Sequence, residues 1–204
     1  MHRFLSLFRS MFTLGLVLGA GVALAQEAPD ALVKRVSQDV MATIKADPKI
    51  QAGDQARIKE VIETKLLPNF DFERITALAM GRNWRQASPE QQKQLVDQFR
   101  TLLVRTYSGA LSQYRDQTID FKPLRADASA TDVNVRTEVV RPGQQPVQID
   151  YGLAKGPNGW KVYDVIVGGV SLVTNYRDEF NEQIKNGGID GLIASLQKKN
   201  AGGK

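Results

Sequence analysis

Residues 132–153 read DVNVRTEVVRPGQQPVQIDYGL, and this stretch decides the fold. From Val133 to Val139, valines and one threonine alternate with polar or charged residues, and a similar alternation returns from Val147 to Leu153. A period of two places successive side chains on opposite faces of a β-strand. The intervening Arg141-Pro142-Gly143 is typical of a turn. The stretch therefore predicts two half-buried antiparallel strands.

Patterns on both sides of this hairpin complete the fold. Two more strands are expected at 118–124 and 160–167, with a turn at 156–159, which makes a meander of about four strands. Helical periodicity marks the segments 29–47, 54–67, 70–81 and 88–114 before the strands, and 171–185 and 190–198 after them. This order predicts an α+β fold, in which N-terminal helices and one long helix pack on a curved antiparallel sheet.

The long helix has the clearest start signal in the chain. Ser88-Pro89-Glu90-Gln91 combines a serine N-cap, a proline in the first turn and a glutamine three residues after the cap. The 3.6-residue period that follows continues to Tyr114. Such a helix measures roughly 39 Å at 1.5 Å per residue, which is longer than a small domain needs to cross its own core. We therefore expect it to cover something wide.

The N-terminus resembles a secretory signal. Residues 1–25 contain Arg3 and Arg9, an apolar run and a small-x-small motif at Ala23-Leu24-Ala25, so we expect cleavage before Gln26 and export of one domain, 26–204. The apolar run is shorter than the ~20 residues of a membrane span. Losing both arginines lowers the net charge from +5 to +3. Since the chain has no arginine-rich segment, we expect no nucleic-acid partner.

Composition excludes most enzyme chemistry. The chain has no cysteine, and its one histidine, His2, lies in the leader, so a thiolate nucleophile, a Cys/His metal site and a Ser-His-Asp triad are all excluded from the mature protein. Aspartate and tyrosine remain as candidates. Asp150 beside Tyr151 and Asp164 beside Tyr163 leave open a small exported cone-fold enzyme of the ketosteroid-isomerase type.

Short motifs, several of them built on aromatic residues, follow one another between residues 83 and 180. In order they are Asn83-Trp84-Arg85, Ser88-Pro89-Glu90-Gln91, Phe99, Tyr107, Trp160-Lys161-Val162-Tyr163-Asp164-Val165, Gly169-Val170-Ser171-Leu172, Asn175-Tyr176-Arg177 and Phe180. With this order, this spacing and the leader, the chain resembles the MlaC family, also called toluene-tolerance auxiliary proteins, over residues 29–198. Gly168 departs from the family pattern, which has a larger and often acidic residue there.

The resemblance implies a non-enzymatic phospholipid carrier in the periplasm that maintains the lipid asymmetry of the outer membrane. The partners it implies are phospholipid, an outer-membrane lipoprotein–porin complex and an inner-membrane ABC transporter with an MCE-domain subunit. It also implies a deep apolar cavity in the fold, with bound phospholipid as cargo. We expect a monomer with no cofactor, no metal and no catalytic residue.

We expect the acyl tails to lie between the long helix and the sheet. The candidate lining residues are Phe99, Leu103, Tyr107 and Tyr114 on one side, and Val133, Val135, Ile149, Tyr151, Val165, Val167, Val170, Val173 and Tyr176 on the other. A solid core is the alternative, because periodicity does not distinguish packed side chains from a hollow lined by them.

Charged and aromatic residues near the presumed mouth are secondary candidates. Arg82, Arg85 or Lys161 are candidates for attracting the lipid phosphate, although exposed cations are commonly solvated surface. For Trp84 and Trp160 we favour anchoring in the core over a position at the lip of the cavity.

Overall fold

The computed structural model describes residues 26–112, 116–127 and 129–202, and the leader lies outside them. Four α-helices and three short helical turns, η1 to η3, precede the long helix α5 (Pro89–Ser112). The four helices are α1 (Pro29–Ala46), α2 (Pro48–Gln51), α3 (Gln55–Val61) and α4 (Phe72–Met80). Five strands and α6 (Leu172–Asn200) follow. The α+β fold class predicted from the sequence is confirmed.

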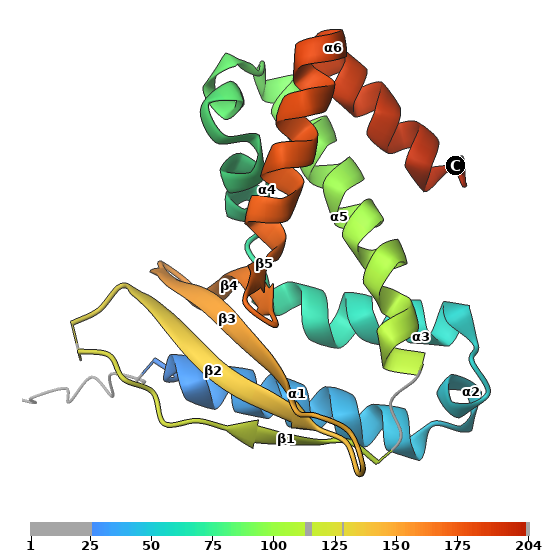
Figure 1. Cartoon of the computed structure of the whole chain (residues 1–204), viewed down its shortest axis with the longest axis vertical. Coiled ribbons are helices and arrows are strands. Elements are labelled where there is room, and N and C mark those ends of the chain that lie inside the picture. The colour runs from blue at the N-terminus through green and yellow to red at the C-terminus, as the bar shows by residue number, and fades with distance from the viewer. Residues whose placement is uncertain (1–25, 113–115, 128, 203–204) are drawn as a thin grey trace, which may run out of the picture.

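The strands form one antiparallel sheet in the order in which they occur along the chain (Figure 1). They are β1 (Thr118–Phe121), β2 (Asp132–Val140), β3 (Val147–Gly156), β4 (Gly159–Val167) and β5 (Val170–Ser171). The fifth strand is an addition to the expected meander. It exists because Gly168 and Gly169 both adopt positive φ, 56° and 85°, and so reverse the chain in a tight hairpin turn.

The second expected helix is divided in three. Asp54 accepts hydrogen bonds from the backbone N–H groups of Ala56 and Arg57 and starts α3. The helix then widens into one π-helical turn, η1 (Ile62–Leu66), and tightens into a 3₁₀ turn, η2 (Leu67–Asn69), at Pro68. The short helix α2 was not expected. It starts at Asp47, whose side chain accepts from Lys49 N–H.

The capping box of α5 forms as predicted. The backbone N–H of Ser88 donates to Gln91 Oε1 at 2.9 Å, and the N–H of Gln91 donates to the Ser88 hydroxyl at 3.2 Å. The two C-terminal helices expected from the sequence run together as α6, with a kink at Gly188, where φ is 67° and ψ is −171°.

Two hydrophobic clusters hold the molecule together. The upper cluster in Figure 1 joins α4, α5 and α6, and its centre is Phe99, whose ring lies 4.8 Å from that of Tyr176 and 4.9 Å from that of Phe180. The lower cluster joins α1, α2, α3 and η1 to strands β2, β3 and β4. The partly buried Phe70 packs against both clusters.

Candidate functional site: an apolar hollow between helices and sheet

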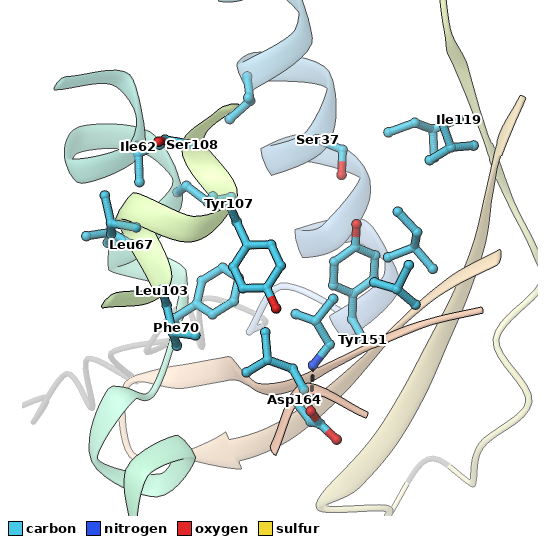
Figure 2. Close-up of a pocket in the computed structure, with 18 of the residues that line it drawn as sticks. Ser37, Ile62, Leu67, Phe70, Leu103, Tyr107, Ser108, Ile119, Tyr151 and Asp164 are labelled. Carbon is cyan, nitrogen blue, oxygen red and sulfur yellow. Dashed lines mark hydrogen bonds between the residues drawn. The ribbon is translucent and has the colours of Figure 1, made fainter. Parts of the chain in front are cut away.

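A hollow of about 680 Å³ lies between the sheet, α1, η1, the C-terminal part of α5 and the start of α6 (Figure 2). Most of the side chains that line it are aliphatic or aromatic. Figure 2 shows Leu103, Phe70 and Tyr107 grouped on one side of the space and Tyr151 rising from the sheet on the other. The volume falls within the range of about 300–1,000 Å³ that is typical of ligand sites.

More than half of the candidate lining residues border this hollow. The long helix and the sheet contribute seven of them to the lining: Leu103, Tyr107, Ile149, Tyr151, Val165, Val167 and Val170. The location between α5 and the sheet is therefore as expected for these residues.

The other candidates do not line the hollow. Tyr114 lies outside the described residues. The remaining five are buried in the packed clusters: Phe99, Val173 and Tyr176 in the upper one, Val133 and Val135 in the lower one. Their apolar faces are those expected, but α4, α5 and α6 pack together around the first three, and α1 packs against β2, which carries the other two. The expectation that these five line the cavity is therefore wrong.

A second helical wall was missed. From its middle to its C-terminal end, α1 contributes Ser37, Val40, Met41 and Ile44, and η1 contributes Ile62 and Leu66. The apolar stripe of residues 29–47 was visible in the sequence, but the same stripe also packs the N-terminal half of α1 into solid core. No signal within the stripe marks where packing ends and the hollow begins.

The mouth of the hollow has an apolar rim. Val170 is 63% exposed, and Val167 and Tyr107 are each 46% exposed, although all three line the hollow. Val167 and Val170 flank the β4–β5 turn, and Tyr107 lies near the end of α5. Arg141, just after β2, brings one positive charge to the lining. A ligand can therefore keep a polar end outside while its apolar part enters.

Asp164, the carboxylate that touches the hollow, is occupied by structural hydrogen bonds. Its Oδ1 accepts from the N–H groups of Val165 and Val173 at 2.9 and 3.1 Å, and its Oδ2 accepts from the Ser171 hydroxyl at 2.6 Å. The Ser171 hydroxyl in turn accepts from Thr174 N–H and caps α6. Asp164 thus joins β4 to the start of α6. Because both of its oxygens already accept hydrogen bonds, it is poorly placed to act as a general base.

The other aspartate–tyrosine pair gives no base either. Asp150 is buried on the opposite face of β3 and accepts a hydrogen bond from Gln148 at 2.8 Å. Burial raises the pKa of the Tyr151 phenol, and the hydrogen bond with Thr137 offsets this only in part. Burial likewise raises the pKa of Tyr176 to about 12. Both phenols are therefore neutral at physiological pH.

The secondary candidates lie away from the hollow. Lys161 donates to the Pro68 carbonyl at 2.6 Å, and Arg82 and Arg85 lie on the turn η3 (Gly81–Gln86), apart from the lining. Trp84 packs against the upper cluster and Trp160 against the lower one, as anchors of the core.

Within the described part of the chain, acidic side chains nowhere gather in a group of three that could hold a metal ion. Over the same residues, no helix is both long enough and apolar enough to cross a membrane.

A helix-covered antiparallel sheet with an apolar, ligand-sized hollow defines a protein that holds a hydrophobic molecule. The chain belongs to the MlaC family, whose model matches residues 34–198. This is a family of phospholipid-binding transport proteins and not of enzymes.

Named relatives agree with this assignment. The chain is 24% identical, over 92% of its length and 89% of the relative's, to the intermembrane phospholipid transport system binding protein MlaC of Haemophilus influenzae. It is 26% identical to the toluene tolerance protein ttg2D of Pseudomonas putida, over 83% of this chain and 79% of that protein.

A solved structure is more similar still. The phospholipid-binding protein of Ralstonia solanacearum, determined in complex with a phospholipid, is 46% identical in sequence and superposes with a TM-score of 0.82. The match covers 86% of this chain and 98% of that one.

Proposed function

We propose that this protein binds a phospholipid and carries it through water, with the acyl tails in the hollow and the headgroup at the mouth. The observation that carries the proposal is the apolar hollow itself, which opens to solvent at the rim formed by Tyr107, Val167 and Val170. The phospholipid held by the similar protein of Ralstonia solanacearum supports the same ligand class.

The energetics explain why such a carrier needs a hollow of this kind. A diacyl lipid with about thirty methylenes faces roughly 24 kcal/mol when it leaves a bilayer unescorted, at about 0.8 kcal/mol per methylene. Burying an unpaired phosphate is also prohibitive, so the headgroup stays in water. An apolar lining with an exposed mouth meets both requirements.

We further propose that the carrier works in the periplasm and shuttles lipid between an outer-membrane lipoprotein–porin complex and an inner-membrane ABC transporter with an MCE-domain subunit. The signal-like leader, residues 1–25, supports export, and membership of the MlaC family supports the role. In this proposal the mature chain, residues 26–204, acts as one lipid-binding domain and a monomer, and its shuttling maintains outer-membrane lipid asymmetry.

The test places a long cation inside the hollow. Ile149→Arg and Val165→Arg each put a guanidinium among apolar side chains, so we expect a folded protein that no longer co-purifies with phospholipid. Native mass spectrometry detects the bound lipid, and circular dichroism checks the fold.

Gln148→Arg is the matched control. Gln148 is the neighbour of Ile149, faces the opposite side of β3 and is exposed, so its arginine variant should retain lipid. Lipid retained by both hollow variants, or a wild-type protein that never contains phospholipid, would contradict the proposed function.

A further inference from the structure

The hollow ends at the same depth on three elements. Along β3 its lining includes Ile149 and Tyr151 but not the next inward-facing residue, Leu153. Along β4 it includes Val167 and Val165 but not Val162. On α1 the lining begins at Ser37. Between the sheet and α1, the inner boundary is therefore the row formed by Ser37, Tyr151 and Val165. On the side of α4 the lining continues through Phe70, which bridges to Val162, to Phe72 and Ile75.

Solid core lies behind this row. Leu153 is 0% and its cross-strand partner Val162 is 4% exposed, and both belong to the lower cluster with the N-terminal half of α1. Close-packed interiors have few voids larger than a water molecule. A hydrocarbon chain that lies between the sheet and α1 and reaches the boundary row therefore has no further space to enter there.

Tyr151 is the largest side chain of the boundary row. It pairs across the sheet with Val135 on one side and Val165 on the other. Figure 2 shows its ring extending from β3 toward α1, with its hydroxyl on the side of Ser37. Tyr151 is the last residue of β3 that lines the hollow.

We propose that Tyr151 is the end stop of the part of the hollow between the sheet and α1, and that it sets the longest acyl chain that the protein covers there. This inference rests on the proposed function and adds its chain-length specificity. Moving a methylene from bilayer to hollow is nearly neutral, whereas a methylene that does not fit is exposed to water. Uptake should therefore be flat with increasing chain length up to a limit, and beyond it fall about fourfold for each further methylene.

The test measures the longest acyl chain that is taken up by the wild-type protein and by variants of Tyr151. Purified full-length protein is incubated with vesicles containing equal amounts of synthetic phosphatidylethanolamines whose acyl chains lengthen stepwise from lauroyl to arachidoyl, and bound lipid is read by mass spectrometry. Tyr151→Ala should move the limit to longer chains, and Tyr151→Trp should move it to shorter ones. Tyr151→Phe keeps the ring and should keep the wild-type limit.

Tyr107→Ala is the matched control, because it removes the same side chain at the mouth. It should lower uptake of every lipid by a similar factor and leave the limit in place. If Tyr151→Ala does not fold, the Trp variant alone decides. An unchanged limit in every folded Tyr151 variant would overturn the inference while leaving the proposed function intact, whereas a wild-type protein that takes up no lipid would overturn both.

Discussion

Phe99 and Tyr107 lie just over two turns apart on α5, yet their surroundings are opposite. Phe99 is fully buried among the aromatic rings of α6, whereas Tyr107 borders the hollow and is nearly half exposed. Helical spacing predicted that both residues share one apolar face. It could not predict which element stands opposite each of them, because that depends on how α6 returns along α5.

This difference predicts different costs of truncation. Phe99→Ala should lower the free energy of unfolding by about 3–5 kcal/mol, because it leaves a cavity in packed core. Tyr107→Ala opens no new cavity and should cost less than about 1 kcal/mol. Urea denaturation of both variants, freed of lipid, measures the two values. Equal losses would show that the two sites are packed alike.

At the scale of elements, the strands were the most predictable feature. Residues 132–140 form β2, one residue longer at each end than the alternation from Val133 to Val139 that predicted it, and the meander order is confirmed. A strand with one face in water shows its pattern in the sequence. The division of the helix expected at 54–67 was not visible, because Ile58, Val61, Ile62 and Leu66 recur at the spacing of one uninterrupted amphipathic helix.

The kink in α6 provides a test at this scale. Gly188 has φ 67° and ψ −171°, a region that is essentially restricted to glycine, so Gly188→Ala should lower the free energy of unfolding by about 1–3 kcal/mol. A Cβ added at Gly188 meets no atom within 4 Å, so the cost comes from the backbone alone. Thermal denaturation with a two-state fit measures the change.

Gly187→Ala is the neighbouring control. Its Cβ also meets no atom within 4 Å and its φ is not positive, so alanine should stabilise α6 by up to about 1 kcal/mol. Destabilisation of similar size at both positions would show that the effect is steric and not conformational.

For the molecule as a whole, cargo should contribute to stability by mass action. A ligand present at about 100 times its Kd stabilises the native state by about 2.7 kcal/mol. For a chain of this size that corresponds to a rise in Tm of roughly 5–10 °C. We therefore expect protein stripped of lipid to melt lower than reloaded protein, as measured by differential scanning calorimetry. Val165→Arg should melt at the same temperature under both conditions, and a wild-type Tm that does not respond to reloading would argue against binding in the hollow.

The two hydrophobic clusters described above meet at Phe70, and the hollow lies along their junction. Each cluster is packed within itself, and only some of its residues border the hollow. Filling and emptying therefore require no refolding of either half. In the proposed carrier, the rate of lipid exchange is then limited by the passage of the acyl chains through the mouth, and not by a conformational change of the interior.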